Sequence, residues 1–167
     1  MILADVNALI YAFRPETSLH KLARGALTEC RDNGTLIVLP DVAASFLRVV
    51  TDKRLSTSPD KTDDALSFID VLTGNGRLLR EARASRWTSF RHLIELTGVS
   101  GSLVPDTLIA ATGLDYDAPV LTADRDFLKF PGLRVQLMTP LGIIDHTVAE
   151  VGPPRSKRRG EPSLRAN

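Results

Sequence analysis

Cysteines, long apolar runs and an N-terminal basic segment are scarce or missing in this sequence of 167 residues. Cys30 is the only cysteine, which excludes an internal disulfide and a cysteine-rich metal site. No apolar stretch approaches the roughly 18 residues that a membrane-spanning helix needs. Residues 1–5 carry no lysine or arginine, unlike the start of an ordinary secretory signal. We therefore expect a cytoplasmic protein without a membrane segment.

Charge is nearly balanced over the whole chain but unevenly distributed along it. Hydrophobic residues make up 43% and charged residues 25%, a mixture typical of one globular domain at this length. Residues 151–167 hold five cations against Glu161, a net charge of +4, which leaves −3 for residues 1–150. This basic segment has no apolar periodicity. We predict a folded domain over residues 1–147 and a basic, disordered tail over residues 148–167.

Short apolar runs alternate with helix-like segments along the predicted domain. Strands are predicted at residues 2–4, 36–39, 119–122 and 133–136, where short apolar runs are bounded by polar or turn residues. Helices are predicted at residues 8–13, 19–30, 59–72, 87–97 and 103–114, and directly after Pro40. This alternation indicates an α/β fold with a mainly parallel sheet.

Several carboxylates follow the predicted strands. Asp5 comes directly after the first strand, Asp124 and Asp126 follow the third, and Asp106 lies in the first turn of the helix over residues 103–114. Capping or turn formation explains each of them alone. In open α/β sheets, however, the carboxyl ends of the strands form the binding edge. Two charges about 4 Å apart repel by about 4 kcal/mol, so such a cluster favours a cation such as Mg²⁺ or Mn²⁺.

Five short segments of the chain resemble, in the same order, the PIN-domain ribonucleases and in particular the VapC toxins of VapBC toxin–antitoxin systems. Together they place about residues 1–145 within the resemblance, and their order is more specific than any single motif. The segments are Asp5-Val6-Asn7, Phe46-Leu47-Arg48-Val49-Val50-Thr51, residues 104–111, residues 121–127 and Phe130-Pro131-Gly132-Leu133.

The resemblance implies a PIN-like three-layer α/β/α fold and an endoribonuclease that hydrolyses RNA with water activated by Mg²⁺ or Mn²⁺. It also implies a VapB-type antitoxin as partner and a homodimer. Carried over position by position, it assigns the catalytic and metal-binding roles to three acids and supporting roles to three neighbours. The acids are Asp5, Asp106 and Asp124, and the neighbours are Asn7, Thr122 and Asp126.

One position departs from the family pattern. The family usually has a glutamate directly before the Phe-Leu pair, where this chain has Ser45. Asp41 lies four residues earlier, on the same face of the predicted helix, and could supply the missing carboxylate directly or through water. Alternatively, Asp41 only caps its helix. The missing acid also keeps open a catalytically impaired RNA-binding module. A phosphatase with Asp5 as nucleophile is a further alternative, but Asn7 stands where that chemistry usually needs a second aspartate.

The segment before the fifth predicted helix is basic. Arg80, Arg83 and Arg86 are candidates for binding RNA phosphates, because an acidic pocket needs cations around it to hold a polyanion; a solvated face is the simpler interpretation. Trp87 and Phe90 could stack on bases, but their helical spacing with Ile94 favours packing in the core.

Overall fold

The computed structural model describes residues 1–55, 58–74 and 81–150, which form a central five-stranded sheet in the order β2-β1-β3-β4-β5. The first four strands run parallel, and only β5 is antiparallel to its neighbour β4. The bounds are β1 Ile2–Ala4, β2 Leu36–Ile37, β3 Val120–Thr122, β4 Arg134–Thr139 and β5 Gly142–Thr147. The predicted α/β fold with a mainly parallel sheet is confirmed.

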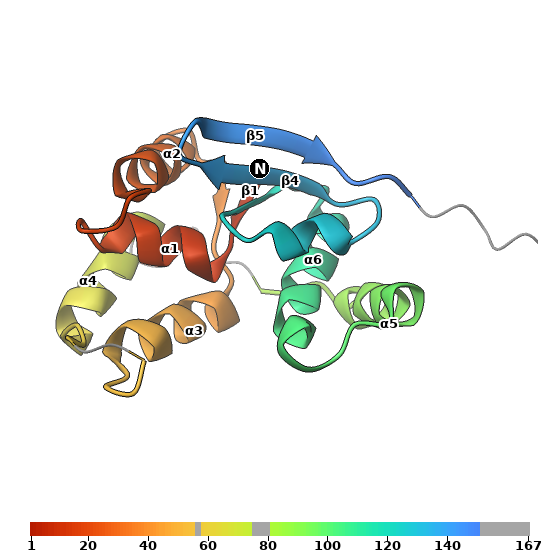
Figure 1. The fold of residues 1–167 in the computed structure, drawn as a ribbon, viewed down its shortest axis with the longest axis horizontal. Coiled ribbons are helices and arrows are strands. Elements are labelled where there is room, and N and C mark those ends of the chain that lie inside the picture. Colours follow the sequence, from red (N-terminus) through yellow and green to blue (C-terminus); the bar gives the residue numbers. More distant parts are fainter. Residues whose placement is uncertain (56–57, 75–80, 151–167) are drawn as a thin grey trace, which may run out of the picture.

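In the described part of the chain, six α-helices flank the sheet and complete three layers. In Figure 1, α1 to α4 lie on one side of the central strands, and α5 and α6 lie on the other. Their bounds, with two short 3-10 helices η1 and η2, are α1 Val6–Phe13, α2 His20–Asp32, α3 Pro40–Thr51, α4 Thr62–Thr73, α5 Arg86–Thr97, η1 Gly101–Leu103, α6 Val104–Tyr116 and η2 Arg125–Lys129. No helix in the described residues is long and apolar enough to cross a membrane.

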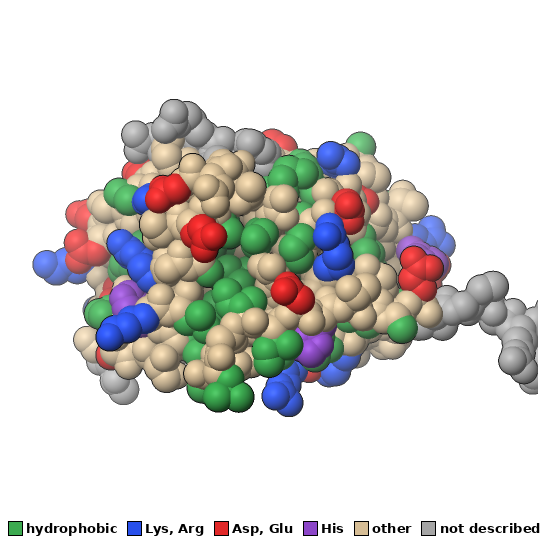
Figure 2. Space-filling view, turned by 90° about the horizontal axis from the view of Figure 1, so that it is seen from above, with side chains coloured by type: hydrophobic (Ala, Val, Ile, Leu, Met, Phe, Trp, Pro, Cys, Tyr) green, Lys and Arg blue, Asp and Glu red, His purple; other side chains and the backbone are tan. Residues whose placement is uncertain are grey.

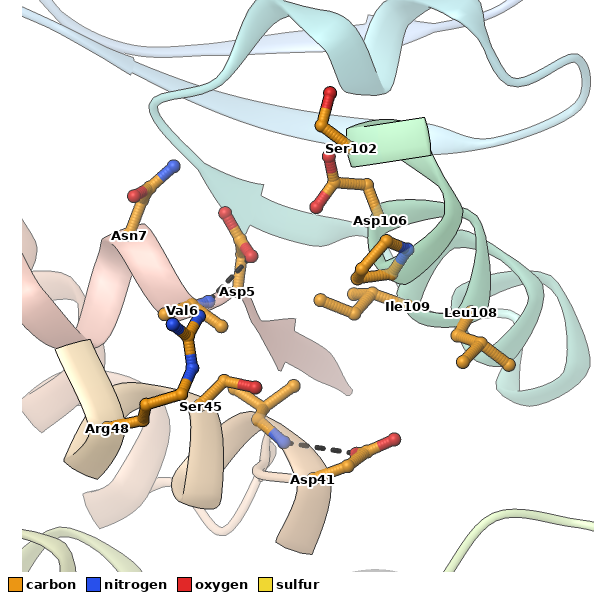
Figure 3. Close-up of a pocket in the computed structure, with 12 residues that line it drawn as sticks. Asp5, Val6, Asn7, Asp41, Ser45, Arg48, Ser102, Asp106, Leu108 and Ile109 are labelled. Atoms are coloured by element: carbon orange, nitrogen blue, oxygen red, sulfur yellow. Dashed lines mark hydrogen bonds between the residues drawn. The ribbon is translucent and has the colours of Figure 1, made fainter. Parts of the chain in front are cut away.

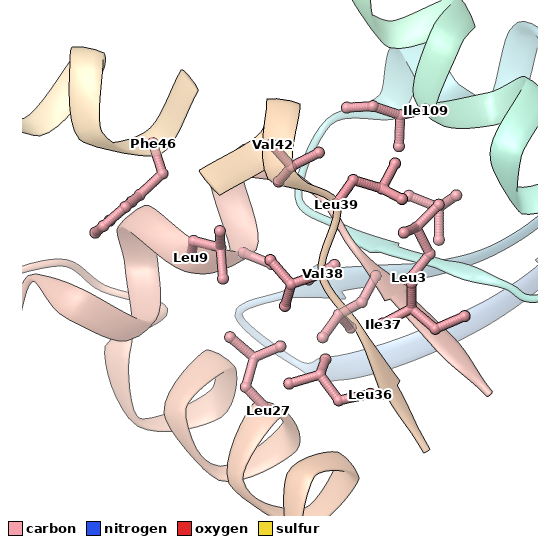
Figure 4. Close-up of a cluster of buried hydrophobic side chains, with 14 of the residues drawn as sticks. Leu3, Leu9, Leu27, Leu36, Ile37, Val38, Leu39, Val42, Phe46 and Ile109 are labelled. Carbon is pink, nitrogen blue, oxygen red and sulfur yellow. The ribbon is translucent and has the colours of Figure 1, made fainter. Parts of the chain in front are cut away.

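The core lies between the inner strands and the first three helices (Figure 4). Leu3 on β1 and Leu36 on β2 are buried, as continuous apolar strands in a covered parallel sheet should be. Phe13, Phe46 and Phe68 form a triangle with ring centroids 5.3 to 5.5 Å apart, which joins α1, α3 and α4. This packing fixes α3 against α1 and thereby sets one wall of the pocket described below.

The start of α4 was predicted three residues too early. The sequence suggested a first turn at Pro59, but the helix begins at Thr62. The cause is a tertiary contact: the Asp60 carboxylate accepts two hydrogen bonds from Arg14, at 2.7 and 2.9 Å, and its N–H bonds to the Val50 carbonyl oxygen. Asp60 is thereby held in a non-helical position against α1 and α3.

Strand β5 was not predicted, because its sequence does not alternate between apolar and polar residues. Ile143 and Ile144 are adjacent, and both remain partly exposed on this edge strand. Figure 2, which looks onto the β5 side, shows apolar side chains between charges of both signs. After β5 the chain still pairs with the fold, since Val148 exchanges backbone hydrogen bonds with Gly132 and Leu133. Most of the predicted tail, residues 151–167, lies outside the described residues.

The expectation that Trp87 packs in the core is wrong. Its side chain is 67% exposed, and it contacts Phe90 at a centroid distance of 5.5 Å. Phe90 is partly buried against the core and Leu93 is buried, so α5 packs through these two residues and leaves Trp87 at the surface.

Candidate active site

Asp5 is the most deeply buried carboxylate of the predicted acidic cluster. It follows β1 directly, its side chain is 2% exposed, and one carboxylate oxygen accepts the Val6 N–H at 2.6 Å as the cap of α1. The other oxygen accepts the Thr122 hydroxyl at 2.7 Å. Burial raises the pKa of Asp5 to about 6, opposed by these hydrogen bonds and reinforced by the charge of Asp124.

Thr122 connects two of the predicted acids. It ends β3, which pairs in parallel with β1 through Ala4 and Leu121, so residues 5 and 122 meet at the same sheet edge. While its hydroxyl donates to Asp5, it accepts the Asp124 N–H at 2.9 Å. Asp124 in turn caps η2 by accepting the Asp126 N–H at 2.8 Å. Thr122 thus fixes the η2 loop relative to Asp5.

Asp106 approaches this group from the other side of the sheet edge. It lies in the first turn of α6, directly after Pro105 at the helix start. Its pKa is raised to about 6, first by partial burial and then by the charges of Asp5, Asp124 and Asp126. The charges of the other three predicted acids thus all act on Asp106, and that of Asp124 also acts on Asp5.

A pocket of about 410 Å³ opens between α3 and α6, with Asp5 at its base (Figure 3). The predicted residues that line it are Asp5, Asn7, Asp41 and Asp106, together with Ser45. Asp124, Asp126 and Thr122 are not among its lining residues. Thr122 ends β3 and contacts Asp5, Asp124 caps η2, and Asp126 in the first turn of η2 forms a 2.7 Å ion pair with Lys129.

The donors at this edge suit a hard divalent cation, because carboxylate oxygens are the ligands that Mg²⁺ and Mn²⁺ prefer. The raised pKa values of Asp5 and Asp106 point the same way, since a cation would relieve the desolvation and repulsion that cause them. Within the described residues, no three His, Cys, Asp or Glu side chains converge closely enough to hold an ion as they stand. Metal binding by Asp5, Asp106 and Asp124 stays a prediction.

Asp41 has a partner that the sequence did not reveal. One carboxylate oxygen forms a 2.6 Å ion pair with Arg86 of α5, and the other accepts the Val42 N–H at 3.1 Å. Asp41 and Ser45 line the same pocket from one face of α3. The carboxylate of Asp41 therefore ties α3 to α5 and has one oxygen already engaged by a guanidinium.

The arginines predicted to bind RNA make contacts within the protein where they are described. Arg83 donates to the Asp115 carbonyl oxygen at 2.6 Å, and its guanidinium lies 4.2 Å from the Tyr116 ring centroid. The Arg86 side chain is 15% exposed in its pair with Asp41. Arg80 lies outside the described residues. Their binding of RNA stays a prediction.

Two polar residues that line the pocket, Ser102 and Arg48, were not identified as site candidates from the sequence. Ser102 lies in η1, and no motif marks it. Arg48 follows Asp41 by seven residues and Ser45 by three, a spacing that puts all three on one face of a helix. This helical spacing is the signal by which Arg48 could have been found.

Replacing Asp106 by Asn is expected to stabilise the metal-free protein at pH 8. The raised pKa means that deprotonation costs folding free energy as pH rises through about 6, whereas below about 4 the carboxyl is neutral in both folded and unfolded states. The full shift from 3.8 corresponds to about 3 kcal/mol, which solvent screening at this half-buried group reduces to about 1 kcal/mol. Thermal unfolding at pH 8 and pH 4 tests this. A stabilisation of equal size at both pH values would contradict the charge explanation.

Comparison with known proteins gives one family and a set of relatives. A family model described as PIN domain matches residues 2–133. VapC ribonuclease Mb2897 of Mycobacterium bovis is 36% identical over 136 residues, which cover 80% of this chain and 92% of that protein. Ribonuclease VapC25 of Mycobacterium tuberculosis is 29% identical, over 80% and 96% of the two chains. Among solved structures, VapBC2 from Rickettsia felis, bound to a DNA fragment from its promoter, superposes with a TM-score of 0.59 at 23% identity, over 80% of this chain and 96% of that one.

Proposed function

The chain belongs to the PIN-domain family, and on that premise we propose that it is an endoribonuclease, the toxin of a type II toxin–antitoxin system. The observation that carries the proposal is the 36% identity to a VapC ribonuclease over 92% of that protein's length. The acidic pocket at the carboxyl end of β1 supports it, because a divalent ion that activates water for phosphodiester hydrolysis is held by oxygen ligands of this kind.

The proposed catalytic and metal-binding residues are Asp5, Asp106 and Asp124, which would hold Mg²⁺ or Mn²⁺. A divalent ion bound there would supply an activated water and neutralise charge on the phosphoryl group. Thr122 positions Asp5 through its hydroxyl and holds the loop of Asp124 through that residue's N–H. Asn7 on the pocket wall and Asp126 beside it are the other supporting residues.

The alternative is a PIN-fold module that binds RNA without cleaving it, which the serine at position 45 keeps open. The two functions differ in one readout. An active enzyme should convert a labelled RNA of defined sequence into shorter fragments in Mg²⁺ or Mn²⁺. A binding module should instead shift the electrophoretic mobility of the RNA and leave the RNA intact. The assay uses the full chain expressed without any partner, with a DNA strand of the same sequence as a substrate control.

The partner assignments follow from the family membership. We propose that a VapB-type antitoxin binds this protein and silences it, that the toxin forms a homodimer, and that both act in the cytoplasm. The likeness to a VapC ribonuclease and to the VapBC2 structure of Rickettsia felis supports the antitoxin assignment. Co-expression with the product of the adjacent upstream gene tests it, with a stable complex of reduced ribonuclease activity as the expected result.

Ser45→Glu is expected to tighten Mn²⁺ binding by at least about tenfold, because it restores a carboxylate to the pocket wall. Asp41 would contribute only through water, since Arg86 already occupies one of its oxygens. Loss of such an indirect contact typically costs about 10–100-fold in affinity. We therefore expect weaker Mn²⁺ binding in Asp41→Asn and recovery in the double variant, measured by titration calorimetry. If Asp41→Asn binds Mn²⁺ as tightly as the wild type does, Asp41 has no part in metal binding and serves only to pair with Arg86 of α5.

A further inference from the structure

We propose that Arg48 binds a phosphate group of the RNA in the acidic pocket; this inference rests on the proposed function. Arg48 lies in the last turn of α3 and lines the pocket together with Asp5 and Asp106. Figure 3 shows its side chain extending from α3 toward the start of α1, on the side of the pocket where Asp5 and Val6 lie. A guanidinium is thereby placed beside the carboxylates that would act on the substrate.

The guanidinium of Arg48 is available for a ligand. Among the described residues, no side chain or carbonyl group forms a hydrogen bond or ion pair with it, and the residue is exposed. The nearby Asp52, one turn further on, is paired instead with Arg54 at 2.9 Å. By contrast, Arg86 of α5, which does not line the pocket, is held by Asp41. Among the described residues that line the pocket, Arg48 is the only arginine, and its donors have no described partner.

Electrostatics explains why this pocket needs such a residue. Asp5 and Asp106 line it, and the charge of Asp124 acts on both. These three carboxylates repel a polyanion, and the two charges of a divalent ion would offset only part of theirs, while Asp41 is already paired with Arg86. RNA entering the pocket therefore requires a further cation close to the reacting phosphate. A guanidinium is suited to this task because its planar donors match two phosphate oxygens at once and remain charged at every relevant pH.

The serine at position 45 also explains why Arg48 lacks an ion-pair partner on its own helix. Asp41, Ser45 and Arg48 form one stripe along α3 that faces the pocket, so Arg48 is the next residue on this face after the position where the family carries glutamate. With serine at position 45, the carboxylate within one turn of Arg48 on this stripe is that of Asp52, which forms its ion pair with Arg54 and interacts with Arg48 only through its charge. The guanidinium is left free for the substrate.

The test compares Arg48→Gln and Arg48→Lys with the wild type in Mg²⁺-supported cleavage of a short labelled RNA. Loss of hydrogen bonds to a charged group predicts a KM raised by about 10–100-fold in Arg48→Gln, with a smaller change in kcat. Arg48→Lys should recover part of this loss, because lysine keeps the charge without the paired donors. Arg31→Gln is the matched control: it removes the same charge from α2, where Arg31 forms an ion pair with its neighbour Asp32 and does not line the pocket. Its KM should equal that of the wild type.

A second measurement uses no cleavage. RNA binding in chelator is followed by fluorescence anisotropy at several salt concentrations, and the slope of log affinity against log salt should fall by about 0.7 in Arg48→Gln, the value for one lost contact to a single strand. Thermal unfolding checks that the variants are folded.

If the wild type cleaves RNA while Arg48→Gln keeps the wild-type KM and salt slope, the Arg48 proposal is wrong and the ribonuclease assignment stands. If Arg48→Gln instead binds Mn²⁺ more tightly with unchanged RNA affinity, Arg48 is a counter-charge for the acids, which also overturns the proposal. If the wild type itself fails to cleave, the proposed function is at fault.

Discussion

Replacing Asp5 by Asn is expected to reduce RNA cleavage by at least about 1,000-fold while leaving the protein folded. A divalent ion contributes several kcal/mol to such a reaction, and each 1.36 kcal/mol corresponds to a tenfold change in rate. Asp5 is central to the proposed metal site because it lies at the base of the pocket and is linked through Thr122 to the loop of Asp124. Equivalent losses are expected for Asp106→Asn and Asp124→Asn.

The fold should survive the Asp5 substitution. An asparagine oxygen can still accept the Val6 N–H that caps α1, and the buried charge that raises the pKa of Asp5 is removed. Asp70→Asn on the exposed surface of α4 is the control, because it removes a carboxylate that does not line the pocket. Initial cleavage rates and circular dichroism spectra are compared for the four variants. Wild-type rates in Asp5→Asn, Asp106→Asn and Asp124→Asn would remove these residues from the active site.

Chelation should have an effect of similar size. Excess EDTA is expected to lower cleavage to the uncatalysed background, and addition of Mg²⁺ or Mn²⁺ beyond the chelator should restore it. The physical reason is that Asp5 and Asp106, whose pKa values are raised by burial and by neighbouring negative charges, lack without a cation the positive charge that activates a water molecule for attack.

The same titration gives a binding signal that does not depend on cleavage. Because the ion would bind only the folded protein, Mn²⁺ should raise the unfolding temperature in proportion to the logarithm of its concentration above the dissociation constant. The Asp5→Asn variant should lack this rise. Full activity in EDTA, or an equal thermal shift in the variant, would contradict a metal site at these carboxylates.

The part of the site that lies on the sheet edge was predictable from the sequence. Asp5 and Asp124 each follow an apolar strand, and parallel pairing of β1 with β3 brings strand ends together by simple geometry. Thr122 was identified only through the family resemblance, and its two hydrogen bonds now give it a physical role as the connection between these acids.

The remaining contacts depend on how the helices dock, which local patterns do not specify. The Asp41–Arg86 pair joins residues 45 positions apart on α3 and α5. Periodicity correctly indicated that one face of α5 is buried, but it placed Trp87 on that face. A short helix with a broad apolar face can dock in more than one orientation, and each orientation buries a different part of the face. Arg48 was overlooked because an arginine on a helix is usually only solvated, and its significance appears once α3 and α6 enclose the pocket.

The central claim is that the carboxylates at the ends of β1 and β3 and at the start of α6 hold the ion used in RNA cleavage. The most direct test of it is to locate Mn²⁺ in crystals by anomalous scattering. The account predicts a peak bounded by the side chains of Asp5, Asp106 and Asp124, at the base of the pocket between α3 and α6. A protein that cleaves RNA with Mn²⁺ but binds the ion only elsewhere, with no peak near Asp5, would contradict it.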